Sequence, residues 1–358
     1  MPWAQRIGGL ESPFVHPLAA VLAETSPVAA VAHGLGSDDV LQQVSGLTPL
    51  QSLGIPIALL GAVFMSLGAI YQHRGVTKVE AASRHEAAHG LSPRHLVRLL
   101  TRPSWIAGTV MLGLAILLQL TSLALAPLVI VQPLGVVSLV ITTLVTARQI
   151  RIPLSPQKWL AVGMCVVGVG AFVTVAGFYS VQVVIVEWQI VTVLLVMVAV
   201  IGVYALLFAL FRRKSKALFY IVGAGVIYGF VATLAKITIN RVQHGNVEWL
   251  TLICIAGILI GTAAGAYFVQ TAYASGPPDM VIAGLTVIDP LVAVVIGVSV
   301  LLEVNGAPWF TYVLFIIFGA LAVAGVVVLE RGQTMAELDA TKKRALGRSA
   351  TERDPGTG

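Results

Sequence analysis

Long apolar runs, separated by short polar segments, fill the sequence from residue 55 to residue 329. A helix that crosses a bilayer needs roughly 20 mostly apolar residues, because each residue adds about 1.5 Å and the hydrocarbon layer is about 30 Å thick. Nine runs meet this requirement: 55–72, 104–125, 127–147, 159–178, 188–211, 217–240, 248–273, 280–302 and 308–329. Five of them start near a tryptophan, where an indole ring prefers the membrane interface: Trp105, Trp159, Trp188, Trp249 and Trp309. The pattern predicts an all-α polytopic membrane protein with nine transmembrane helices.

Composition supports this prediction and narrows the classes of protein. Apolar residues make up 57% of the 358 positions and charged residues 11%, against about 25% charged in a typical soluble domain. These values exclude a soluble enzyme, a disordered chain and a disulfide scaffold. Cys165 and Cys254 both lie inside apolar runs, so they predict no disulfide framework. We expect no enzymatic activity, no cofactor and no nucleic-acid partner.

The basic residues predict the orientation in the membrane. Nearly all of the 22 Lys and Arg residues lie in the segments 73–103, 148–158, 212–216 and 331–358, which alternation of the spans places on one side. Positive loops face the cytoplasm, so the N-terminus is expected outside and the C-terminus inside, in a plasma membrane. Residues 1–54 are expected to form a disordered external tail, and the polar end of the chain, within 331–358, a disordered cytoplasmic one. The excess of Arg over Lys suggests a GC-rich bacterial source.

An internal repeat relates the two halves of the chain. A shift of 151 positions aligns several identical residues without a gap, among them Gln119 with Gln270, Pro127 with Pro278 and Gly168 with Gly319. The hydropathy pattern agrees, which gives a first repeat at 55–178, a linking helix and basic loop at 179–216, and a second repeat at 217–330. A single linking helix inverts the second four-helix repeat. Inverted repeats are typical of alternating-access carriers, although they also build channels and scramblases.

The third and fourth predicted helices resemble a known family. Residues 122–139 read SLALAPLVIVQPLGVVSL, and a glycine-rich helix follows at 159–178. This order is similar to the NIPA-type magnesium transporters of the drug/metabolite transporter (DMT, EamA-like) superfamily, over about residues 55–330. The resemblance implies nine spans, inverted repeats and transport of Mg²⁺. The chain departs from the family at Ala283-Gly284, where a Thr-Pro is usual, and other members of the superfamily carry drugs and metabolites.

Asp289 is the first candidate for a pathway residue. It lies inside the eighth predicted span, where a carboxylate is costly and usually faces a cavity or binds something. Pro290 cannot donate to the carbonyl of Thr286, so that oxygen is expected to be free near the carboxylate. Oxygen ligands of this kind suit Mg²⁺, which keeps several waters. The alternatives are a proton site coupled to solute movement and a protonated structural Asp.

Other polar residues within the spans are weaker candidates. Lys236 is expected to extend to the outer interface, or alternatively to act as an outer gate. Gln119 and Gln270 are equally interpreted as helix-packing groups or pathway contacts. Gln132 and Pro133 predict a kink with an amide beside it, and both are candidates for the wall of the pathway. Small-residue rows predict close helix packing: Gly61 with Gly68, Gly163 with Gly170, and Gly257 with Gly261 and Gly265.

One loop motif indicates a different chemistry. His85, Glu86 and His89 match the H-E-x-x-H pattern of zinc peptidases. Gly90 and Pro93 follow at once, and the loop is too short to build a peptidase cleft, so an ordinary solvated loop is the favoured interpretation.

Together these observations predict an integral membrane transporter of magnesium or another divalent cation. The alternative is a proton-coupled DMT-type carrier of an organic or lipid-linked solute, and the outside alternative is a membrane metallopeptidase. The expected partners are the bilayer and Mg²⁺ or a small solute as cargo, with a homodimer left open.

Overall fold

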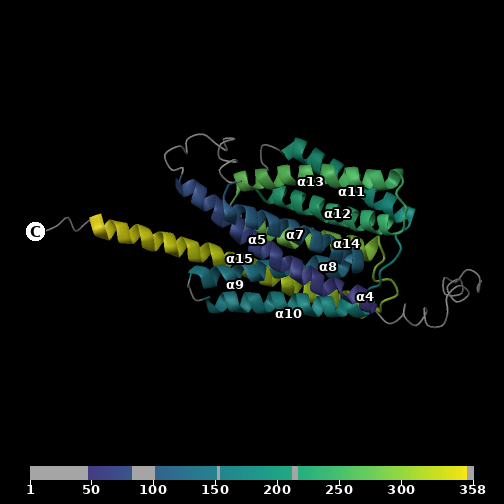
Figure 1. Cartoon of the computed structure of the whole chain (residues 1–358), viewed down its shortest axis with the longest axis horizontal. Helices are drawn as coiled ribbons and strands as arrows, with labels where there is room; N and C mark the ends of the chain where they lie inside the picture. Colours follow the sequence, from purple (N-terminus) through teal and green to yellow (C-terminus); the bar gives the residue numbers. More distant parts are fainter. Residues whose placement is uncertain (1–46, 83–100, 151–153, 212–216, 277, 353–358) are drawn as a thin grey trace, which may run out of the picture.

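All regular secondary structure in the described part of the protein is helical. The computed structural model describes residues 47–82, 101–150, 154–211, 217–276 and 278–352, and no strand occurs in these ranges. The helices are α4 (Pro49–Ser52), α5 (Gly54–Ala82), α7 (Pro103–Leu125), α8 (Leu128–Leu134), α9 (Val136–Ile150), α10 (Pro156–Tyr179), α11 (Glu187–Phe211), α12 (Ala217–Gln243), α13 (Trp249–Ser275), α14 (Pro278–Ser299) and α15 (Trp309–Glu352) (Figure 1). The predicted loop motif of His85, Glu86 and His89 lies outside the described residues, as does the tail before residue 47.

The prediction of nine membrane-spanning helices is confirmed for the described ranges. Nine segments there are long and apolar enough to cross a bilayer, with α8 and α9 together forming one of them. Trp159, Trp188, Trp249 and Trp309 each lie in the first turn of a helix and are exposed, as expected for interfacial indoles. The hydropathy pattern therefore located the spans to within a few residues.

Helices extend into both segments that the sequence predicts as tails. At the N-terminal end, α4 begins at Pro49, because Thr48 caps it in a capping box with Gln51. At the other end, α15 continues to Glu352 instead of stopping near residue 330. The segment after the last span is rich in Ala, Glu, Leu, Lys and Arg and has no proline before residue 355, so helix propensity carries the helix onward.

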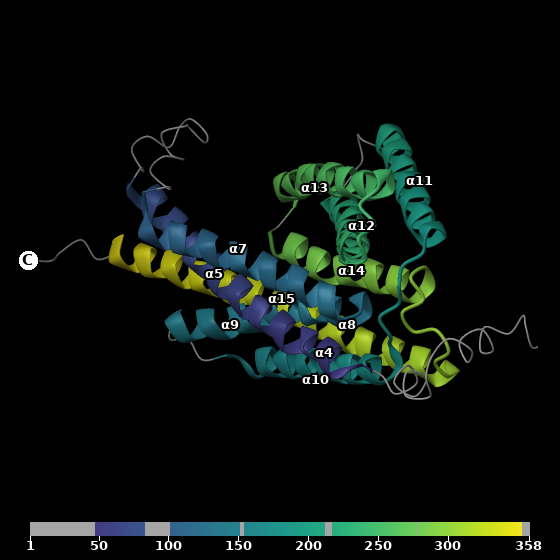
Figure 2. The same ribbon diagram turned by 45° about the vertical axis from the view of Figure 1, so that its right-hand side comes forward.

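The described helices pack chiefly in three pairs. The most extensive contacts join α5 with α7, then α10 with α15, and then α12 with α13. In the predicted repeat, α5 with α7 and α12 with α13 would be equivalent pairs, while α10 and α15 are the last helices of the two halves. Figure 2 separates the layers: α11, α12 and α13 lie together, while α9, α10 and α15 lie on the other side of α5 and α7. Among the described helices, α11 packs chiefly against α12.

Glycines permit close approach in two of these pairs, as predicted. A Cβ added at Gly68 would lie 3.0 Å from the carbonyl oxygen of Gly108 in α7. On α13, added Cβ atoms at Gly257, Gly261 and Gly265 would each lie less than 3.0 Å from a side chain of α12. The glycine rows of α5 and α13 are therefore packing surfaces.

The prediction for the glycine row of α10 is wrong. Nothing lies within 4 Å of a Cβ added at Gly163 or Gly170. The contact with α15 uses Gly168 instead, where an added Cβ would lie 2.6 Å from the backbone nitrogen of Ala322. Spacing alone could not identify the face of α10 that meets a neighbour.

Candidate functional site

The third span consists of two consecutive helices, α8 and α9, and α8 lies in the protein interior. Pro133 lies inside α8, and Gly135 separates α8 from α9, in agreement with the predicted kink. Gln132 and every other residue of α8 except Pro133 are buried. At its other end α8 follows α7 after only Ala126 and Pro127. The end of α7 and the start of α8 thus form a tight turn, which we call the 123–129 turn.

Lys236 hydrogen-bonds to this turn, and the expectation that it extends to the membrane interface is wrong. Its side chain is 2% exposed. The Nζ atom donates hydrogen bonds to the carbonyl oxygens of Leu123, at 2.7 Å, and Ala126, at 2.8 Å. The last carbonyls of a helix lack partners within that helix, and a buried ammonium that cannot reach water satisfies two carbonyls at the end of α7.

Glu303 supports the other half of the turn, and sequence reasoning missed it. It lies in the connection between α14 and α15 and is 3% exposed. Its two carboxylate oxygens accept hydrogen bonds from the backbone N–H groups of Leu128 and Val129, both at 2.9 Å. These are the first N–H groups of α8, where a negative charge also interacts favourably with the helix dipole. The only signal in the sequence was an acid within a short apolar connection.

The local backbone presents Glu303 to the turn. Leu302, directly before it, has φ of 58°, a left-handed conformation that a leucine rarely adopts. Gly297 leaves room for the carboxylate, because an added Cβ there would lie 3.1 Å from Oε2 of Glu303. Burial raises the pKa of the Glu303 carboxyl, and the Lys236 ammonium and the two N–H groups oppose that rise.

Further hydrogen bonds fasten the same turn. The side-chain amides of Gln182 and Gln243 both donate to the carbonyl oxygen of Ala124, at 3.0 and 3.3 Å. The Ser122 hydroxyl donates to the carbonyl oxygen of Gly54 at 2.7 Å. Side chains from three other segments, α12, the α10–α11 connection and the α14–α15 connection, therefore fix one turn.

Asp289 has a different environment within α14. Its Oδ1 atom is buried and has no hydrogen-bond partner. The backbone of α14 lies close to α12 here, since an added Cβ at Gly229 would be 3.0 Å from the Asp289 carbonyl oxygen and one at Gly225 would be 2.7 Å from Ile288. The Thr286 hydroxyl donates to the Ile282 carbonyl of its own helix at 2.8 Å. The carboxylate consequently keeps an unused acceptor in the middle of a span.

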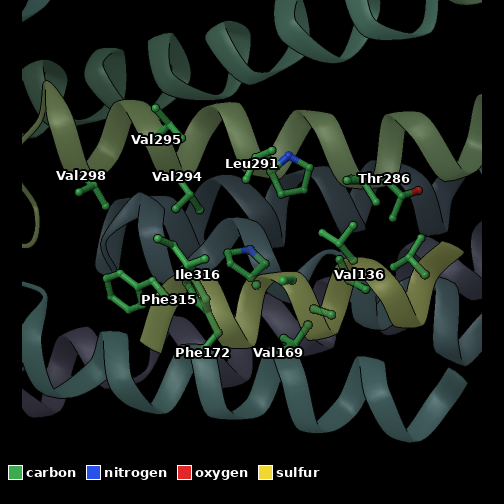
Figure 3. A pocket seen from close by; sticks show the side chains of 18 of the residues that line it. Val136, Val169, Phe172, Thr286, Leu291, Val294, Val295, Val298, Phe315 and Ile316 are labelled. Atoms are coloured by element: carbon green, nitrogen blue, oxygen red, sulfur yellow. The ribbon is translucent and has the colours of Figure 1, made fainter. Parts of the chain in front are cut away.

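An apolar cavity of about 560 Å³ is lined by residues of α14 that flank Asp289 in the sequence. Its walls come from α14 and α15, with α8, α9 and α10 on the inner side (Figure 3). Three of the predicted pathway residues line it: Thr286, Pro290 and Pro133. Asp289 precedes Pro290 but is not itself a lining residue. The sequence therefore identified part of the cavity wall and missed its apolar remainder.

The two glutamines related by the repeat are not brought to this cavity. Gln119 lies on α7, and its backbone nitrogen is 3.7 Å from a Cβ added at Gly61 in α5. Gln270 is exposed on α13. Neither lines the cavity, and their role as pathway contacts stays a prediction.

The described residues include no group of three or more His, Cys, Asp or Glu side chains that could hold a metal ion. The expectation of a Mg²⁺ path therefore depends on Asp289 and nearby backbone oxygens. A buried carboxylate with one unused oxygen can bind a proton, or a cation that retains most of its water.

The fold, with its nine candidate spans in the described ranges, is that of an integral membrane protein with multiple spans. No family model matches the chain, and no solved structure matches it. The chain is similar to the uncharacterized protein Cgl0250/cg0304 of Corynebacterium glutamicum, with 26% identity over 286 residues, which cover 79% of this chain and 96% of that protein. The similarity extends over nearly the whole of a bacterial relative.

Proposed function

We propose that the protein is a secondary carrier in which Asp289 binds and releases a proton while an organic solute occupies the neighbouring cavity. The observation that supports this most directly is the unpartnered Oδ1 of Asp289, one residue from Pro290 in the cavity wall. Intramembrane acids commonly serve in proton relays and ion paths. The apolar lining favours a solute with a large apolar part over a bare hydrated ion.

The internal repeat adds a reason to propose transport. Equivalent helices of the two halves form the pairs α5 with α7 and α12 with α13, as an inverted repeat of the DMT type would. Carriers of this kind place the solute site between the repeats and interrupt spans beside it. The break between α8 and α9, next to Pro133 in the cavity wall, fits that arrangement.

The experiment is solute-driven proton movement in proteoliposomes that contain a pH-sensitive dye. A panel of organic ions with large apolar groups is added, beginning with tetraphenylphosphonium, and the internal pH is followed. We expect a response in the native chain, its loss in Asp289→Asn, and its retention in Glu187→Gln, an exposed acid at the start of α11. A response that persists in Asp289→Asn would overturn the assignment of the proton site.

Transport of Mg²⁺ is the second candidate, and one observation favours it. The unused Asp289 oxygen, with the Thr286 carbonyl that Pro290 leaves without its usual donor, supplies oxygen ligands of the kind that Mg²⁺ prefers. Proteoliposomes with an internal Mg²⁺ indicator separate the two candidates. Mg²⁺ entry that needs Asp289, without proton movement driven by organic solutes, would replace the first proposal by the second.

A further inference from the structure

The cavity beside Asp289 opens sideways, toward the hydrocarbon of the bilayer. Three of its lining residues are also strongly exposed: Leu291 at 53%, Val295 at 55% and Ile316 at 71%. They belong to α14 and α15, and their side chains are labelled among the lining residues in Figure 3. Both helices cross the membrane, so the exposed edges face lipid. We call this feature the α14–α15 groove.

The groove offers almost no polar contact to a ligand. Its lining hydroxyls are already engaged: Ser299 donates to the Val295 carbonyl at 2.6 Å, Tyr312 to the Val304 carbonyl at 3.1 Å, and Thr286 to its own helix. The remaining lining is aliphatic or aromatic. A ligand with polar groups along its whole length would lose hydrogen bonds to water here and gain none.

The groove is also long in the direction of the spans. Its wall on α14 extends from Thr286 to Ser299, which at about 1.5 Å per residue is roughly 20 Å. Its volume of about 560 Å³ is within the range of roughly 300–1,000 Å³ of ordinary ligand sites. A single extended hydrocarbon chain matches this length, polarity and lateral entrance.

We propose that the α14–α15 groove binds the acyl chain of an amphiphilic substrate, which enters from the bilayer and not from the aqueous phase. This inference rests on the proposed carrier function and names the substrate class. The polar group of the substrate then lies toward the Thr286 end of the groove, where Asp289 supplies the neighbouring carboxylate. In this proposal Asp289 and the α14–α15 groove act on the same substrate molecule.

Gly319 makes the groove testable. It lines the groove, and a Cβ added there would meet only the Phe172 ring, at 3.9 Å, so Gly319→Leu adds side-chain atoms at the groove wall from a position that has room for a Cβ. Gly170→Leu is a matched control, because nothing lies within 4 Å of that position and it does not line the groove. Ala320→Phe, at the next lining position, is a second filling variant in case Gly319→Leu does not fold.

The experiment uses the full chain in liposomes that contain phosphatidylglycerol with a photoreactive group in the middle of one acyl chain. After irradiation, mass spectrometry locates the adducts. We expect adducts on the groove-lining residues of α14 and α15, their loss in Gly319→Leu or Ala320→Phe, and their retention in Gly170→Leu. Adducts spread equally over the lipid-facing residues of α11 and α13, or unchanged in both filling variants, would overturn the proposal.

A second measurement tests whether the bound chain belongs to a substrate. Movement of head-labelled phosphatidylglycerol between leaflets is followed by chemical quenching of the outer label. We expect movement that Asp289→Asn and Gly319→Leu both abolish. Loss of adducts in Gly319→Leu without any loss of movement would identify a structural lipid and overturn the inference. Asp289-dependent transport of water-soluble ions without groove adducts would overturn the inference alone, whereas groove adducts without any Asp289-dependent transport would overturn the carrier function.

Discussion

Buried ionisable side chains are fully engaged in hydrogen bonds to the 123–129 turn, whereas the one in the middle of α14 is not. At the 123–129 turn, the Lys236 ammonium and the Glu303 carboxylate make four hydrogen bonds to backbone groups that no helix satisfies. In α14, one oxygen of Asp289 has no partner. A buried charge is tolerated only when its hydrogen bonds are made. The first site therefore fixes a structure, while the second leaves a buried acceptor unused.

The largest expected effect comes from Glu303→Ala. This change leaves the first N–H groups of α8 without their acceptor and Lys236 without a countercharge. Removing one partner of a buried charged pair costs about 3–5 kcal/mol, so we expect a strongly lowered unfolding midpoint in detergent. The double variant Lys236→Met with Glu303→Ala should lose less stability than the sum of the two single variants, because the two effects are coupled. A loss equal to that sum would show that the two charges act independently.

A middle-sized effect is expected where α12 and α14 approach beside Asp289. In Gly229→Ala, the new methyl group would lie 2.7 Å from Cβ of Val292, so one helix must move. Overpacking of this kind costs about 1–3 kcal/mol, and the unfolding midpoint should fall. Gly202→Ala on α11 is the control, because nothing lies within 4 Å of an added Cβ there; it should leave the midpoint unchanged or raise it slightly. Equal effects of the two changes would contradict the close approach.

The smallest effect on stability is expected from Asp289→Asn. Because Oδ1 has no partner to lose, the change in unfolding free energy should stay below about 1 kcal/mol, while proton-coupled transport is lost. The comparison fails if Asp289→Asn lowers the unfolding midpoint as much as Glu303→Ala does. In that case Asp289 is a structural group, and the proposed role in transport fails with it.

The sequence predicted what depends on local pattern. The spans follow from apolar runs, the interfacial tryptophans from their position at the start of those runs, and the interruption near Pro133 from the missing N–H of proline. The partners of Lys236 and Glu303 could not be found in this way. They depend on where the end of α7 meets residues more than 100 positions away, which a pattern along the chain does not record.

The candidate site was predicted only in part for a similar reason. Asp289 and Pro290 attract attention because an acid is rare in an apolar span. The groove residues Phe315, Ile316 and Gly319 do not differ in type from any other residues of α15 that face lipid. Only the packing of α10 and α14 around them makes a cavity.

The length of α15 links the groove to the space outside the membrane. The helix that carries Gly319 continues from Glu330, at the end of its span, to Glu352, which is roughly 33 Å at about 1.5 Å per residue. Figure 1 shows it extending beyond the other helices. Over that length, each degree of tilt of a rigid helix displaces its far end by roughly 0.6 Å. A fluorophore near that end would convert groove occupancy into a signal readable in water, without any change to the membrane-embedded residues.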